Sequence, residues 1–226
     1  MITNHSKAPG TEKIEALRKT LIQNKTIVTY QDVGASSKHF VTTKRTLSDI
    51  AFTSLLPEKW AQLLYRIACF TEAKRIIELG TSMGLTSLYL SQVPQCKVFT
   101  FEGNPSMVSV ALTHFESFQA NNIQLIEGNL DQTLSDHLQN PAKVQFAFID
   151  ANHRYEPTLR YFELLCKRMS DKGIMVVDDI HQSEEMEKAW NEMKDHELVY
   201  GSVDLFRMGL LFFDLSLNKQ HFVWTL

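Results

Sequence analysis

The sequence predicts an α/β fold, in which helices cover both faces of a doubly wound, mostly parallel sheet. Between residues 74 and 194, five apolar runs of strand length alternate with five amphipathic segments of helix length. A helix between two strands lets them pair in parallel, so this alternation predicts a parallel sheet. After residue 195 only strand-like runs remain, which predicts antiparallel pairing at one edge of the sheet. A glycine-containing turn follows the first run, where sheets of this kind bind their ligands.

The predicted elements divide the chain into a helical N-terminal cap, residues 1–70, and a sheet domain, residues 71–226. Helical spacing of apolar side chains, a capping hydroxyl at Thr46 or Ser48 and Pro57 at a first helical turn indicate the helices of the cap. These helices are expected at 11–23, 47–54 and 57–70. The parallel strands are expected at 75–79, 97–102, 122–127, 144–150 and 173–179, each followed by a helix, and the last runs are 198–206, 208–214 and 221–226.

The composition excludes several classes of protein. The 23 basic and 26 acidic residues give a net charge of -3, which argues against nucleic acid or an anionic membrane as the partner. The N-terminus lacks the apolar core of a signal peptide, and no apolar run approaches the ~18 residues of a membrane span. The three cysteines form no Cys-x-x-Cys pair. We therefore expect a cytoplasmic protein that acts on a small molecule.

The turn after the first strand contains Gly80, Thr81, Ser82 and Gly84, and Glu78 lies inside the preceding apolar run. Glycines at this place let a ligand approach the backbone, although Gly84 could equally serve tight packing between helix and strand. The spacing is G-x-x-x-G, with a serine where a nicotinamide-binding fingerprint has its second glycine. The turn therefore predicts a bound cofactor and weighs against a dinucleotide.

Two further strand ends carry residues suited to a nucleoside. Glu102 and Gly103 follow the second strand, and the carboxylate of Glu102 can take the two hydroxyls of a ribose. Gly128 and Asn129 follow the third strand, where an adenine could lie. A solvated strand end explains any one of these residues, but together they predict a nucleoside-containing ligand.

The runs IIELGTSMGLTSLYL, VFTFEGNP, IEGN, FIDANH and VVDDIH resemble the class I S-adenosylmethionine-dependent methyltransferases over about residues 55–213. The glycine turn is similar to that of the catechol and caffeoyl-coenzyme A O-methyltransferase branch, and the chain as a whole resembles uncharacterised bacterial members. The resemblance implies a Rossmann-like, seven-stranded sheet with an antiparallel last strand. It also implies S-adenosylmethionine as the cofactor, with Glu78 and the Gly80–Gly84 turn near its methionine part, Glu102 on its ribose and Asp150 among the binding residues.

Three acids end the fourth and fifth strands, namely Asp150, Asp178 and Asp179. Carboxylates that converge without a counter-charge repel each other, and a divalent cation with oxygen ligands would relieve this repulsion. The metal-dependent O-methyltransferases place Asp, Asp and Asn there, so the resemblance implies a cation on these residues. Asp179 departs from the expected Asn. Magnesium is one candidate, and manganese, iron or zinc are others if histidines join the site.

His153 and His181 follow the same two strand ends. A neutral imidazole can accept the proton of a substrate hydroxyl, because its pKa lies near physiological pH. Either histidine could instead ligate a metal or be an ordinary loop residue. The N-terminal loop adds Asp32 to His39 and the pair Lys44–Arg45, which could meet an acidic substrate or be a solvated charge pair.

The leading hypothesis is methyl transfer from S-adenosylmethionine to an oxygen of a small molecule, assisted by a divalent cation on Asp150, Asp178 and Asp179, with Asp150, His153 and His181 as catalytic candidates. Three alternatives stay open: a metal-independent methyltransferase with a histidine base, a dinucleotide-dependent oxidoreductase, and a non-catalytic cofactor-binding protein. The apolar end HFVWTL could pair with a second copy in a homodimer, or lie at the sheet edge.

Overall fold

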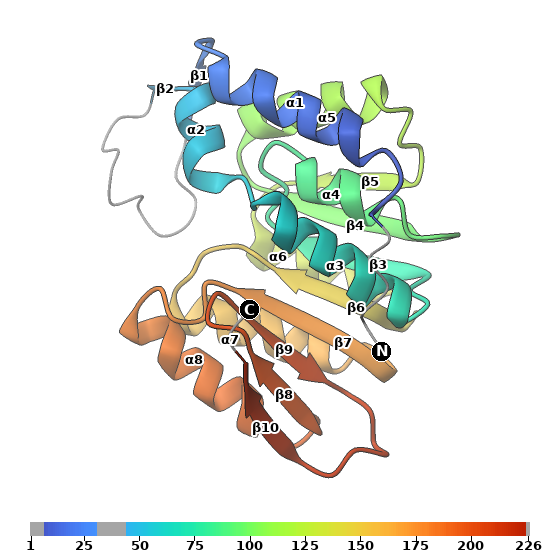
Figure 1. Ribbon diagram of the computed structural model, residues 1–226. Helices are drawn as coiled ribbons and strands as arrows, with labels where there is room; N and C mark the ends of the chain where they lie inside the picture. The colour runs from blue at the N-terminus through green and yellow to red at the C-terminus, as the bar shows by residue number, and fades with distance from the viewer. Residues whose placement is uncertain (1–6, 31–43, 225–226) are drawn as a thin grey trace.

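The computed structural model describes residues 7–30 and 44–224 and contains one large sheet with helices on both faces (Figure 1). The strands of this sheet are β3 (Arg75–Leu79), β4 (Lys97–Glu102), β5 (Ile123–Glu127), β6 (Val144–Ile149), β7 (Met169–Asp178), β8 (Gly201–Asp204), β9 (Met208–Phe212) and β10 (Gln220–Val223). The helices are α1 (Thr11–Gln23), α2 (Leu47–Ser54), α3 (Glu58–Phe70), α4 (Leu85–Leu90), α5 (Pro105–Ser117), α6 (Leu130–His137), α7 (Tyr155–Cys166) and α8 (Glu184–Asp195).

The strands lie in the order β10-β8-β9-β7-β6-β3-β4-β5. Strands β3 to β7 pair in parallel, and β9 pairs antiparallel with both β7 and β8. The predicted doubly wound, mostly parallel sheet with one antiparallel strand near the C-terminus is confirmed, but the sheet has eight strands rather than the expected seven. The strand order reverses between β3 and β6, which is the switch point where such sheets bind ligands.

β10 is an eighth strand, and it pairs in parallel with β8 rather than antiparallel as expected for the last run. Both edges of β9 are already taken by β7 and β8, so the chain after β9 cannot pair with β9 and joins the free edge of β8 instead. Because β8 and β10 both run opposite to β9, they run in the same direction. Phe222, Val223 and Trp224 are exposed at this edge. Pairing with a second copy there stays a prediction.

The sheet separates two hydrophobic cores, because successive side chains of a strand point to opposite faces. Ile76, Phe146 and Val176 join the core under α1 to α5, whereas their neighbours Ile77 and Ala147 join the core under α6 to α8. Strands β3, β4, β6 and the second half of β7 are therefore buried on both sides, which is why they appear in the sequence as apolar runs, whereas the edge strand β5 is only partly buried.

The N-terminal helices share the first of these cores, in which Ile14 of α1 and Leu64 and Ile67 of α3 are fully buried. Thr46 caps α2 through a reciprocal pair of hydrogen bonds with Asp49. The boundary near residue 70 stays a prediction, since the cap and the sheet pack as one body of apolar side chains.

Two local features differ from the expected elements. The segment before α2 contains a short antiparallel pair, β1 (Ile27–Thr29) and β2 (Lys44–Thr46). β7 begins at Met169 because that residue pairs with Val144, ahead of a register shift in β6. Among the residues described, no helix is long and apolar enough to cross a membrane.

Candidate functional site

The predicted site residues follow the carboxyl ends of the five parallel strands, which lie side by side along one edge of the sheet. The turn after β3 is held to its neighbours by backbone hydrogen bonds. The N–H groups of Gly80 and Thr81 both donate to the carbonyl of Phe101 at 3.1 Å, and the N–H of Asp150 donates to Leu79 at 2.9 Å. The ends of β3, β4 and β6 therefore form one connected rim.

The fold itself requires glycine at both positions of the turn, independently of any ligand. Gly80 has φ +98°, and a Cβ there would lie 2.1 Å from the carbonyl oxygen of Asp150. Gly84 has φ +81°, and its Cβ would lie 2.6 Å from the ring of Phe115. Positive φ and close packing both favour glycine, so the packing role considered for Gly84 applies, and it applies to Gly80 as well.

Glu78 is fully buried at the end of β3. Its Oε2 accepts hydrogen bonds from the hydroxyls of Thr100, at 2.6 Å, and Ser87. Its Oε1 is buried and has no partner among the described residues. Burial raises the pKa of Glu78 to about 8, against the effect of the two hydroxyls. The rim thus contains a polar atom that needs a hydrogen-bond partner.

Glu102 organises the loops around it. Its Oε2 accepts from the backbone N–H of Ser82 at 2.8 Å, and its Oε1 accepts from that of Asn104 at 2.8 Å. Burial raises the pKa of Glu102, and the backbone donors around it, including Gly103, oppose this. Two carboxylate oxygens can accept about four hydrogen bonds, so the three backbone donors leave acceptor capacity for a ligand.

The remaining residues predicted to bind the cofactor also make hydrogen bonds that hold the local structure. The hydroxyls of Thr81 and Thr100 lie 2.6 Å apart beneath the turn, and Thr81 is buried. Gly128 has φ +132°, and its N–H donates to the backbone carbonyl of Glu102 at 3.0 Å. Asn129 caps α6 by accepting from the N–H of Asp131 at 3.0 Å. These residues lie on the rim, but their assignment to the cofactor stays a prediction.

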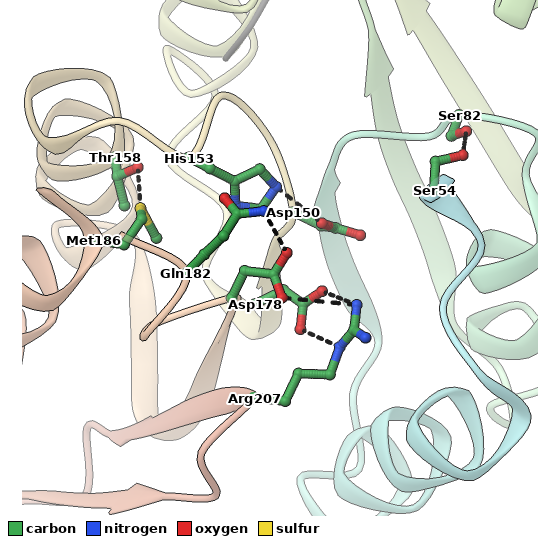
Figure 2. Close-up of polar contacts among 10 residues, drawn as sticks. Ser54, Ser82, Asp150, His153, Thr158, Asp178, Gln182, Met186 and Arg207 are labelled. Atoms are coloured by element: carbon green, nitrogen blue, oxygen red, sulfur yellow. Dashed lines mark hydrogen bonds and ion pairs between the residues drawn. The ribbon is translucent and has the colours of Figure 1, made fainter. Parts of the chain in front are cut away.

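Asp150 and His153 form a pair after β6 (Figure 2). Nε2 of His153 lies 3.4 Å from Oδ1 of Asp150. Asn152 and His153 have φ of +69° and +39°, so the loop is bent tightly under the imidazole. Burial lowers the pKa of His153, but the hydrogen bond and charge of Asp150, with the charges of Asp179 and Asp178, outweigh burial and raise it.

Asp178 faces a cation from the chain itself. Its Oδ1 accepts from Nε of Arg207 at 3.1 Å and its Oδ2 accepts from Nη2 at 2.9 Å (Figure 2). Asp179 lies 3.9 Å from the same guanidinium and accepts from Gln182 at 3.3 Å. Burial, with the charge of Asp150, raises the pKa of Asp178 to about 7, and Arg207 opposes the shift.

This arrangement does not fit a divalent cation. In the described ranges, no group of three or more His, Cys, Asp or Glu side chains is placed to hold a metal ion. Asp150, Asp178 and Asp179 share one end of the rim, but both oxygens of Asp178 are used by Arg207. The three predicted ligands are therefore not presented as a set of free oxygens.

His181 contacts other carboxylates than the Asp150 that pairs with His153. Its Nε2 contacts Oδ2 of Asp204 at 2.8 Å and its Nδ1 contacts Glu187 at 3.2 Å. Burial lowers its pKa, but the two carboxylates outweigh burial and raise it. With both ring nitrogens engaged, His181 has no free nitrogen for a substrate proton in this arrangement.

Sequence reasoning missed Arg207, which precedes β9. The signal was present in the predicted antiparallel strand, because the start of an antiparallel strand lies beside the end of its parallel neighbour. Met208 indeed pairs with Asp178. Of the N-terminal candidates, residues 32–39 lie outside the described residues. Arg45 is buried, with its guanidinium 4.7 Å from the centre of the Tyr30 ring.

The fold and the rim define a doubly wound α/β protein that binds its ligand at the carboxyl edge of the sheet. Residues 77–180 match the family described as a methyltransferase domain. The match covers just under half of the chain and agrees with the resemblance to class I S-adenosylmethionine-dependent methyltransferases. No curated protein matches it.

Solved structures of methyltransferases share the fold. The O-methyltransferase TomG from Streptomyces achromogenes, in complex with SAM, is 20% identical, with a TM-score of 0.63 over 71% of this chain and 82% of that one. An O-methyltransferase from Bacillus cereus, in complex with SAH, is 14% identical, with a TM-score of 0.65 over 93% of each chain. The SAH-bound methyltransferase PaMTH1 from Podospora anserina is 14% identical, with a TM-score of 0.67 over 92% of this chain and 89% of that one.

Proposed function

We propose that this chain methylates a hydroxyl oxygen of a small molecule, with S-adenosylmethionine bound on the β3–β4 side of the rim and His153 as the general base. The pair of His153 and Asp150 at 3.4 Å, next to the glycine turn, is the observation that carries the proposal. The likeness to O-methyltransferases, in which the acceptor atom is oxygen, supports it.

The two carboxyl groups on the β3–β4 side suit a cationic ligand, because a bound positive charge would favour their ionised forms. Glu78 and Glu102 have no ion-pair partner among the described residues; hydroxyls and backbone N–H groups surround them instead. S-adenosylmethionine carries a sulfonium and an ammonium group, and its activated methyl is the group that is transferred. The unpartnered Oε1 of Glu78 would accept from the amino-acid part, and Glu102 would hold the ribose hydroxyls.

The β6 side supplies the proton acceptor. With Nε2 directed at Asp150, the tautomer that donates through Nε2 leaves Nδ1 of His153 free to accept. In the proposed step the acceptor oxygen forms a bond to the methyl carbon, the carbon–sulfur bond breaks, and the hydroxyl proton moves to Nδ1. Asp150 then stabilises the imidazolium. A positioned base of this kind contributes about 10²–10⁴-fold in rate.

No step of this proposal uses a divalent cation, since Asp178 is engaged by Arg207. The near-neutral composition supports a small molecule rather than nucleic acid as the acceptor. A cytoplasmic location is consistent with this chemistry and remains part of the proposal.

Calorimetric titration with S-adenosylmethionine tests the cofactor, and micromolar-range binding is expected. A thermal-shift series with nicotinamide cofactors, which should give no stabilisation, separates this proposal from an oxidoreductase. Absence of heat with S-adenosylmethionine, together with no density in soaked crystals, would refute it. Transfer of a labelled methyl group to a panel of phenols and alcohols, compared with amines and thiols, then tests the acceptor oxygen.

A further inference from the structure

The acid-rich end of the rim contains its own cation, Arg207. The side chain of Asp178 is 1% exposed, and a buried carboxylate is costly unless a counter-charge and hydrogen bonds compensate it. The planar guanidinium supplies both, since its Nε and Nη2 reach the two carboxylate oxygens at 3.1 and 2.9 Å.

The hairpin between β8 and β9 places this arginine. Asp204 accepts from the N–H of Phe206 at 2.8 Å, and Leu205 donates to Met208 at 2.9 Å, so the turn is tight. The carbonyl of Arg207 accepts from the N–H of Ile180 at 3.2 Å, which ties the hairpin to the loop after β7. Arg207 is therefore fixed by backbone contacts on both sides of its side chain.

A divalent cation at this end would meet two obstacles. It would have to displace the guanidinium from Asp178, and a cation bound to Asp179 would lie close to the guanidinium, which is 3.9 Å from that carboxylate. The two positive charges would repel each other in this partly buried site. Without the arginine, by contrast, three carboxylates, Asp150, Asp178 and Asp179, would lie beside the imidazole of His153.

We infer that Arg207 is the resident counter-cation of Asp178 and Asp179 and takes the place of a divalent metal ion at this end of the rim. Arg207 is thus a positioning residue: it holds Asp178 and Asp179 in place beside the Asp150–His153 pair without contacting the reacting atoms. The consequence for catalysis, methyl transfer that needs no added metal, rests on the proposed function. The role of Arg207 as counter-cation of Asp178 and Asp179 does not depend on the proposed function.

Titration of the apo protein with MnCl₂ alone, followed by the electron paramagnetic resonance signal of free Mn²⁺, tests the inference. The wild type should show no stoichiometric binding in the millimolar range. Arg207→Met, which keeps much of the side-chain length but removes the charge, should bind one Mn²⁺ at least about tenfold more tightly. Arg207→Lys should behave like the wild type, because it restores the positive charge. Asp178→Asn in the Arg207→Met background should abolish the new site.

A wild type that binds one Mn²⁺ as tightly as Arg207→Met overturns the inference, and so does a folded Arg207→Met that binds none. Arg207→Gln replaces Arg207→Met if circular dichroism shows that the latter is unfolded, and the wild-type titration decides alone if both variants unfold. Because neither S-adenosylmethionine nor an acceptor is present, failure of cofactor binding would refute the proposed function and leave these outcomes unchanged.

Discussion

The two halves of the rim compensate their acids in different ways. On the β3–β4 side, Glu78 and Glu102 are surrounded by neutral donors, the hydroxyl of Thr100 and backbone N–H groups. On the β6–β7 side, Asp150 faces the titratable imidazole of His153, and Asp178 faces the permanently charged guanidinium of Arg207. Neutral donors orient a carboxylate without cancelling its charge, whereas a guanidinium or a protonated imidazole cancels it. The first half is therefore suited to receive a cationic cofactor, and the second to hold and move a proton.

The largest expected effect is on the β6 side. His153→Asn should lower kcat by about 10²–10⁴-fold, because it removes the proton acceptor and keeps a polar side chain of similar size. The dissociation constant for S-adenosylmethionine should change by less than about threefold. Steady-state kinetics and calorimetry measure the two quantities separately. Equal losses in cofactor affinity and in kcat would show that cofactor binding and proton transfer are not separated between the two sides of the rim.

The same histidine predicts a pH profile. A base must be neutral to accept a proton, and the carboxylates raise the pKa of His153 above its ordinary value of 6.5. The logarithm of kcat should therefore rise with pH through a midpoint above 6.5 and level off at higher pH. A midpoint below 6.5, or a flat profile from pH 5 to 8, would argue against His153 as the base.

On the β3–β4 side, Glu102→Ala should weaken S-adenosylmethionine binding by about 100-fold or more, since charge-assisted hydrogen bonds to the ribose and the ordering of the Ser82 and Asn104 backbone are both lost. Glu102→Gln, which keeps the size and one acceptor oxygen, should lose less. Calorimetry gives both constants, and circular dichroism checks the fold. An unchanged affinity in Glu102→Ala would show that Glu102 does not bind the ribose.

Strand ends could be located from the sequence because buried parallel strands appear as continuous apolar runs that stop abruptly. Glu78, Glu102, Asp150 and Asp178 were therefore placed on one rim correctly. Their partners could not be deduced in this way. The antiparallel strand after Arg207 was predicted, but its register with β7 and the reach of the arginine side chain, which together bring Arg207 to Asp178, leave no periodic signal.

A smaller effect concerns stability. Burial raises the pKa of Glu78 from 4.5 to about 8, so its contribution to the free energy of unfolding is fully present below pH 4.5 and is lost as pH rises through about 8. Glu78→Gln has no such titration. Between pH 5 and 8.5 the cofactor-free wild type should lose on the order of 2–4 kcal/mol more stability than the variant. Urea unfolding at both pH values measures the difference, and parallel losses would mean that Glu78 stays ionised when buried.

The smallest effect is expected at His181, which serves as the control for His153. Its two nitrogens are held by Asp204 and Glu187, and its side chain is 35% exposed, so solvent screens both ion pairs. His181→Asn should change kcat by less than about fivefold and lower stability by less than about 1 kcal/mol. Because the carboxylates raise the pKa of His181, that small stabilisation should be present below pH 6.5 and vanish as pH rises through the folded-state pKa. A rate loss as large as that of His153→Asn would place the proton acceptor on the loop after β7 instead of the loop after β6.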